Sequence, residues 1–225
     1  MSISISDYPV YLQGDLKLDR KCLKSQGGQQ VDAKVFYKET LEISQLAKSR
    51  ETIMERMKHT IVHSATSFGD MRAGILKEVR EENGQYGYFD VVNACGLSYA
   101  RLYSEIEERY EKGNEQYYKT ADGTPLTKEE EMEWLDMQYE QEVEWQKSCA
   151  RIAAQRQVFL GHIPKVPTKE IEELEDSFYQ AKDAYMKLYR ESKQAGKTLV
   201  LQNYMFGNSQ MYEMLNRLGN YKLQI

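Results

Sequence analysis

Glu55, His59 and His63 are the residues whose types and spacing come nearest to a metal site. Residues four apart share one face of a helix, so this pattern aligns a carboxylate with two imidazoles, all of which zinc accepts as ligands. A zinc site needs one or two further ligands and a supporting shell. The sequence holds no HExxH motif and no His/Cys cluster. We therefore treat the three residues as a weak candidate and expect no bound metal and no cofactor.

A second pattern with chemical meaning is FDVVNACGLSYARLYSEIEERY, residues 89–110. It resembles the turn and second helix of bacterial helix-turn-helix regulators at Gly96, Leu97, Ser98, Leu102, Tyr103 and Ile106. The resemblance implies a DNA-binding regulator that uses residues 70–126, with residues 98–110 as its recognition helix.

The charges of this segment favour a different interpretation. The side chains that would enter or flank the DNA groove carry one cation and three carboxylates; they are Tyr99, Arg101, Ser104, Glu105, Glu107 and Glu108. Because phosphates repel carboxylates, we do not expect a nucleic-acid partner. DNA binding is therefore kept only as the alternative hypothesis. The favoured interpretation is one amphipathic helix, about 90–112, that passes through Gly96. Its face of Tyr99, Tyr103, Ile106 and Tyr110 would then pack on protein.

No familiar catalytic pattern is found elsewhere in the sequence. It contains no P-loop, no G-x-G-x-x-G after a strand, no G-x-S-x-G and no calcium loop. The glutamates at 129–133 are explained by the start of a helix. Trp134 and Trp145 lie nearly on one helical face, and we interpret them as core or inter-helix packing. We predict no catalytic residue and no enzymatic activity.

Helical periodicity dominates the chain, and it predicts an all-α fold built on long antiparallel helices. The expected helices cover 33–65, 70–83, 127–160 and 168–195. Thr127 and Glu130 form a capping-box pattern, and Gly161 is the expected helix end. A seam of residues spaced by threes and fours follows, typical of a coiled coil: Ile171, Leu174, Phe178, Ala181, Tyr185, Leu188, Ser192 and Ala195. With its short connector, 127–196 is predicted to be a helical hairpin.

The two ends of the chain differ from this pattern. Residues 1–31 lack periodicity, which predicts an extended or flexible arm before a single elongated helical domain at 32–225. A tight turn at Ala121-Asp122-Gly123 predicts one very short β-hairpin near 118–126. A short helix after Asn208 carries Met211, Met214 and Leu218; such a face suits a partner groove or its own domain.

Composition limits the cellular setting. The 225 residues carry a net charge of −5, and no segment is basic enough to suggest nucleic-acid binding. Cys22, Cys95 and Cys149 are widely spaced, so we expect reduced thiols and a cytoplasmic protein. We expect no membrane association, because no apolar stretch approaches the length of a span and the N-terminus lacks a secretory pattern. Signal-less export, as for an exported helical subunit of a bacterium, is compatible with this N-terminus.

These observations favour a structural or protein-interaction helical protein. It would present amphipathic faces to a protein partner or to itself as a homo-oligomer. The expected interaction face consists of Tyr99, Tyr103, Ile106, Tyr110, Met211, Met214 and Leu218.

Overall fold

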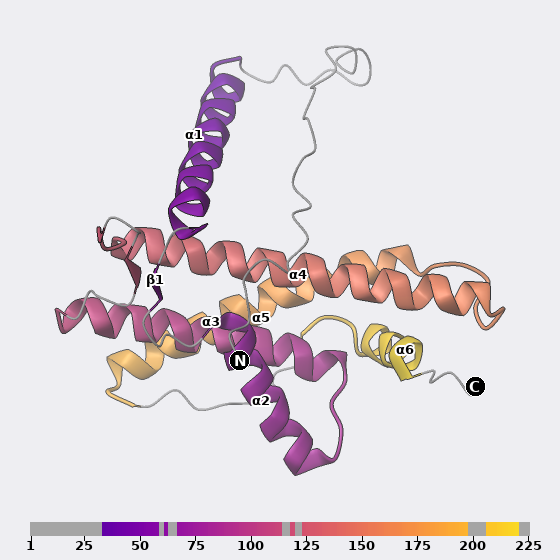
Figure 1. Ribbon diagram of the computed structural model, residues 1–225. Coiled ribbons are helices and arrows are strands. Elements are labelled where there is room, and N and C mark those ends of the chain that lie inside the picture. The colour runs from indigo at the N-terminus through magenta and orange to yellow at the C-terminus, as the bar shows by residue number, and fades with distance from the viewer. Residues whose placement is uncertain are drawn as a thin grey trace. The chain divides into compact units, whose positions relative to one another are not determined.

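The computed structural model describes residues 33–58, 61–62, 67–113, 118–119, 123–197 and 206–220, and these residues are mostly helical (Figure 1). The all-α prediction is therefore confirmed for the described residues. The helices are α1 Ala33–Lys58, α2 Phe68–Asn83, α3 Tyr88–Glu111, α4 Lys128–Phe159, α5 Thr168–Gln194 and α6 Ser209–Asn220. None of them is long and apolar enough to cross a membrane.

The chain divides into two compact units, 1–44 and 45–225, with the boundary inside α1. Of the first unit, the structure describes only the helical residues 33–44. The predicted arm at 1–31 lies outside the described residues. All packing discussed below belongs to the second unit.

The first helix is shorter than predicted. It ends at Lys58 rather than near 65, and Ile61–Val62 form strand β1, paired antiparallel with β2, Tyr118–Lys119. The run Thr60-Ile61-Val62 is β-branched, which favours extended backbone over helix. The helical face proposed for Glu55, His59 and His63 is therefore interrupted by β1, and both histidines lie outside the described residues. The β-hairpin near 118–126 remains a prediction, since 120–122 are not described.

Helix α3 runs without interruption from Tyr88 to Glu111, through Gly96. The two-helix break that a helix-turn-helix requires is therefore absent, and the single-helix interpretation is right. Every residue from 91 to 100 is buried, because α2, α4, α5 and α6 all contact α3. The first part of the supposed recognition helix thus lies in the protein interior.

Gly96 lies where α3 and α5 approach each other closely. A Cβ atom at this position would lie 2.8 Å from Cδ2 of Tyr185, and 2.9 Å and 3.0 Å from the carbonyl carbon and Cβ of Ala181. Only a glycine fits this crossing without displacing the α5 backbone. One turn earlier in α3, Asn93 accepts a hydrogen bond of 3.0 Å from the Tyr185 hydroxyl. The glycine therefore serves helix packing.

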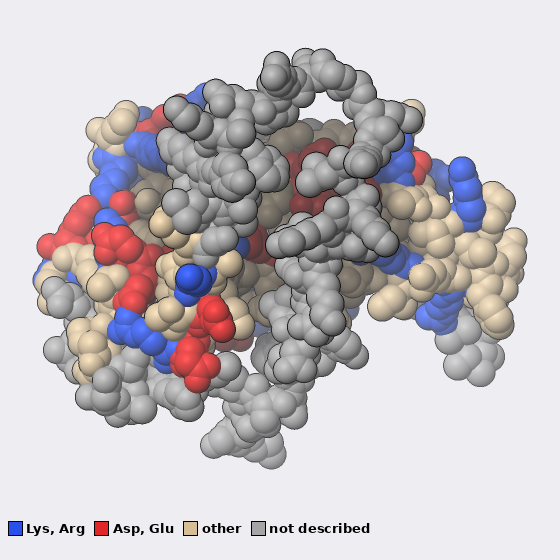
Figure 2. All heavy atoms as spheres, turned by 90° about the horizontal axis from the view of Figure 1, so that it is seen from above, with Lys and Arg blue, Asp and Glu red and all other residues tan. Residues whose placement is uncertain are grey.

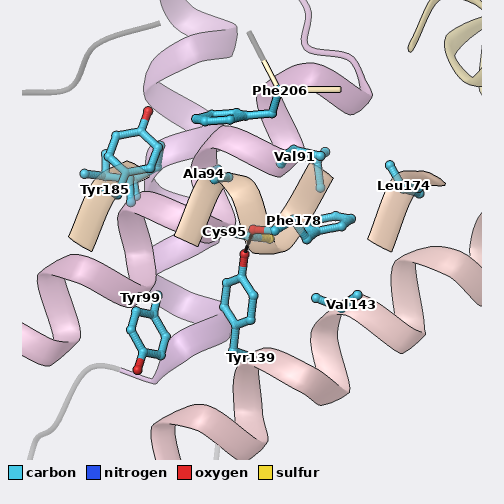
Figure 3. Packing of buried hydrophobic residues seen from close by; sticks show 14 of the residues in the cluster. Val91, Ala94, Cys95, Tyr99, Tyr139, Val143, Leu174, Phe178, Tyr185 and Phe206 are labelled. Atoms are coloured by element: carbon cyan, nitrogen blue, oxygen red, sulfur yellow. Dashed lines mark hydrogen bonds between the residues drawn. The ribbon is translucent and has the colours of Figure 1, made fainter. Parts of the chain in front are cut away.

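Helices α4 and α5 are joined by residues 160–167, and their contacts run in opposite order along the chain (Figure 1). Asp136 pairs with Lys182, and Arg151 near the other end pairs with Glu172. Between them, the Tyr139 hydroxyl donates to the Phe178 carbonyl (Figure 3). The expected capping box starts α4: Glu130 N–H donates to Thr127 Oγ1 at 3.2 Å, and Thr127 N–H to Glu130 Oε2 at 2.8 Å.

One hydrophobic core joins these helices (Figure 3). From α5 it takes the first part of the predicted seam, whose members are completely buried: Ile171, Leu174, Phe178, Ala181 and Tyr185. Figure 3 shows Phe178, Tyr139 and Cys95 meeting where α5, α4 and α3 come together. This part of the seam therefore packs against other helices of the same chain.

We predict that Gly96→Ala lowers the free energy of unfolding by about 1–3 kcal/mol, because the new methyl group overpacks the contact with Ala181. The matched control is Gly74→Ala in the exposed middle of α2, where an added Cβ meets nothing within 4 Å. That change should stabilise the protein by up to about 1 kcal/mol through helix propensity. Urea unfolding followed by circular dichroism measures both; equal effects of the two variants would contradict the close packing at Gly96.

Candidate interaction surface

The tyrosine face predicted on α3 lies against other helices of the same chain. Tyr99 and Ile106 are buried, while Tyr103 and Tyr110 are half-buried. The Tyr99 hydroxyl donates to Asp136 Oδ1 at 2.9 Å, and Lys182 Nζ lies 4.1 Å from the centre of its ring. These contacts come from α4 and α5, so most of this face is occupied within the monomer.

The methionine face of α6 is also directed inward. Met211 and Leu218 are buried in the main core, and Met214 packs against it half-buried. Helix α6 contacts α4 and α3. The sequence left two roles open for this face, binding in a partner groove and packing on its own domain, and the structure shows the second.

A buried ion pair joins the end of α3 to the start of α4. The Glu131 side chain is only 1% exposed, and its two carboxylate oxygens lie 2.6 Å and 3.3 Å from Arg109 nitrogens. The Tyr110 hydroxyl adds a third contact, 2.9 Å from Oε1. A carboxylate with two contacts to an arginine and one to a tyrosine hydroxyl is suited to holding two helices together. It is poorly suited to catalysis.

Lys147 on α4 is the buried cation of the described residues that most resembles a reactive group. Its ammonium lies 2.9 Å from Glu144 and 3.4 Å from Glu172, and it also contacts Glu175. Burial alone lowers the pKa of Lys147, but hydrogen bonds to Glu175 and Glu144 outweigh this and raise the pKa above its ordinary value. The amine therefore stays charged at neutral pH and cannot act as a base or nucleophile.

The two described cysteines are not activated thiols. Cys95 is completely buried in the core, and this burial raises the pKa of its thiol. Burial also raises the pKa of the half-buried Cys149. His162 in the α4–α5 connector contacts Gln157 through Nδ1 at 2.7 Å. Within the described residues, no group of three or more His, Cys, Asp or Glu side chains is arranged to hold a metal ion.

The most unusual surface feature is a row of large apolar side chains on α4. Trp145, Ile152 and Phe159 are 60%, 64% and 89% exposed. They lie seven residues apart, two helical turns, so they form one line along the helix, which we call the α4 stripe. The opposite face of α4 is in the core, with Val143, Ala150 and Ala154 buried. The prediction that Trp145 serves as core or inter-helix packing is therefore wrong.

Charge along α4 changes sign close to the start of this stripe. Residues 128–144 contain eight acidic side chains and one basic one, whereas residues 145–167 contain four basic side chains and no acidic one. Around the α4–α5 connector, at the right of Figure 2, uncharged and basic side chains predominate. Two of these four cations, Lys147 and Arg151, are paired with glutamates of α5, so the sequence around the stripe is basic but part of its charge is neutralised within the chain.

We predict that Glu131→Gln lowers the free energy of unfolding by about 3 kcal/mol, because the Arg109 charge loses its buried partner. The control is Glu108→Gln, which removes the exposed pair of Glu108 with Lys112, 3.1 Å apart. Its effect should stay below about 0.5 kcal/mol. Guanidinium unfolding at pH 7 compares the two, and a small loss at position 131 would show that the ion pair does not stabilise the helix junction.

Comparison with known proteins gives no match for this chain. No protein-family model matches the chain, and neither a curated protein nor a solved structure matches it. No activity or partner of a relative can therefore be carried over to it. The candidate site is the α4 stripe.

Proposed function

We propose that this chain is a protein-interaction component and that it binds protein through the α4 stripe. The observation that carries the proposal is the exposure of Trp145, Ile152 and Phe159 in one line on a single helix. Isolated apolar side chains are ordinary on protein surfaces. A line of exposed apolar side chains on one helix that includes two aromatic residues is typical of a binding surface, because aromatic side chains supply much of the energy at interfaces.

The contacts that hold α4 against α5 favour binding of a partner by a rigid α4. In our proposal, α4 and α5 act as a helical hairpin, with the α5 seam and the ion pairs of Lys147 and Arg151 holding α4 in place. A helix that is already ordered loses little conformational entropy when it binds. Side chains at i, i+7 and i+14 suit a partner helix or groove that follows the same face.

A binding role also agrees with the state of the reactive groups. Among the described residues, Lys147 and Glu131 are engaged in ion pairs, and the thiol pKa of Cys95 is raised by burial. We propose a non-enzymatic protein that works without a cofactor, in the cytoplasm as the cysteine usage favours.

DNA binding is the weaker alternative. On α3, Glu107 is engaged within the chain by Lys128, Lys193 and the Tyr189 hydroxyl. Burial alone raises the pKa of Glu107, but the hydrogen bonds from Tyr189 and Lys193 outweigh it and lower the pKa below its ordinary value. This carboxylate is therefore negative at neutral pH and is used in contacts within the chain, so it does not favour a role of this face in reading DNA. Band-shift assays at low salt test the alternative, and tight, salt-sensitive DNA binding would establish it.

We predict that Phe159→Glu weakens protein association at least about tenfold, because a buried phenylalanine contributes about 1.5–3 kcal/mol. The measurement is quantitative cross-linking and co-purification from the native host, with cross-links mapped by mass spectrometry. Tyr86→Glu is the control, since Tyr86 is 47% exposed and lies outside the stripe. Circular dichroism should show both variants folded. Unchanged association of a folded Phe159→Glu protein would refute the proposed role of the stripe.

A further inference from the structure

We propose that residues 45–58 of α1 form a salt-sensitive latch over the acidic face of α4, closed at low ionic strength and open at high ionic strength. We call these residues the α1 latch. The inference goes beyond the proposed function, because it concerns the acidic half of α4 and does not involve the stripe. Three observations carry it: how little of α1 is buried, which side chains hold it, and how exposed those side chains are to salt.

Apolar burial holds α1 only weakly. Among residues 45–57, only Ile53 is buried, while Met54 and Met57 are half-buried. In α3, by contrast, every residue from 91 to 100 is buried. Among the described elements, α1 alone lacks extensive backbone contact with another one. Because hydrophobic stabilisation scales with the apolar area removed from water, such burial contributes little to holding this helix.

Two arginines of the latch reach α4. Arg50 donates from Nε to Glu133 at 2.5 Å, and its two terminal nitrogens donate to the two carboxylate oxygens of Glu140 at 2.7 and 2.8 Å. Arg56 pairs with Glu130. The two arginines lie six residues apart and therefore share nearly one face of the helix. Charged contacts along this face are thus the main described link between α1 and α4.

Salt can reach these pairs. The side chains of Arg50, Glu140 and Arg56 are 28%, 41% and 27% exposed. The pair of Arg109 with Glu131 is much less accessible, at 14% and 1%. Dissolved ions screen charges that water reaches, and the screening length falls from about 8 Å at 0.15 M salt to about 3 Å at 1 M. Salt therefore weakens the latch contacts and largely spares the buried pair.

The surface beneath the latch favours closing at low salt. Residues 128–144 of this part of the chain contain eight acidic side chains and one basic one. When the latch opens, Glu130, Glu133 and Glu140 lose their arginine partners together. Carboxylates gathered on one helix repel one another and attract the two arginines again once screening is reduced. Opening by salt should therefore be reversible.

Hydrogen exchange of the full-length protein, measured by mass spectrometry at neutral pH, tests the latch. We expect the amides of residues 45–58 to exchange at least about tenfold faster in about 1 M than in about 50 mM sodium chloride. The reason is that an undocked helix is only marginally stable and opens often. The amides of residues 88–111 in α3 are the internal reference, and their exchange should change less than about twofold.

Four variants separate the ion pairs from other effects of salt. Arg50→Gln and Glu140→Gln remove the two sides of one contact, one on each helix. Both should show, already at low salt, the fast exchange of residues 45–58 that the unmodified protein shows at high salt. The matched controls are Lys48→Gln on α1 and Glu129→Gln on α4, each of which removes one charge at an exposed position. Neither residue takes part in the described ion pairs, so both controls should keep slow exchange at low salt.

Equal exchange of residues 45–58 at the two salt concentrations would overturn the inference. So would control variants that speed this exchange as much as Arg50→Gln does. If salt accelerated residues 88–111 to the same extent, it would be unfolding the whole protein, which also contradicts a latch. None of these outcomes bears on the stripe, which is tested separately by the association of Phe159→Glu.

Discussion

The contact between Gly96 of α3 and Ala181 of α5 is the constraint on which the rest of the fold depends. The two backbones come so close there that a single added methyl group would overlap the neighbouring helix. Residues 91–100 on both sides of this contact are all buried, and α2, α4 and α6 also contact α3. The glycine costs helix propensity, about 1 kcal/mol relative to alanine, and the packing that it permits outweighs that cost.

Electrostatic pairing then fixes the helices around this core. Arginines on different helices each reach a carboxylate of α4: Arg50 contacts Glu133 and Glu140, Arg72 contacts Glu142, and Arg109 contacts Glu131. The acidic half of α4 is thereby largely used inside the molecule, whereas the stripe lies mainly over the basic half. Binding of a partner through apolar surface is consistent with this division, because few charges need to be desolvated there.

The sequence could not decide which of two equivalent helical faces would be covered within the chain. Tyr99 and Ile106 do form an apolar face, but a face that is suited to a partner protein is equally suited to the interior. Helix α4 shows the same ambiguity, because Tyr139, Val143, Ala150 and Ala154 compete with Trp145, Ile152 and Phe159. The seven-residue spacing of the second set was visible in the sequence. Which set would be covered depended on where α3 and α5 lie.

The sequence by itself determined the local structure: the all-α class, the Thr127 capping box, the position of α5 and the continuity of α3. These follow from interactions within a few residues, which periodicity and capping patterns report directly. It failed at the end of α1, where pairing of Ile61–Val62 with Tyr118–Lys119 depends on residues far apart in the chain. Tertiary structure alone decided that the Tyr99 face is interior and that the Trp145 face is surface. The physical reason is that burial is a property of neighbouring helices, and a helix's own sequence does not contain their positions.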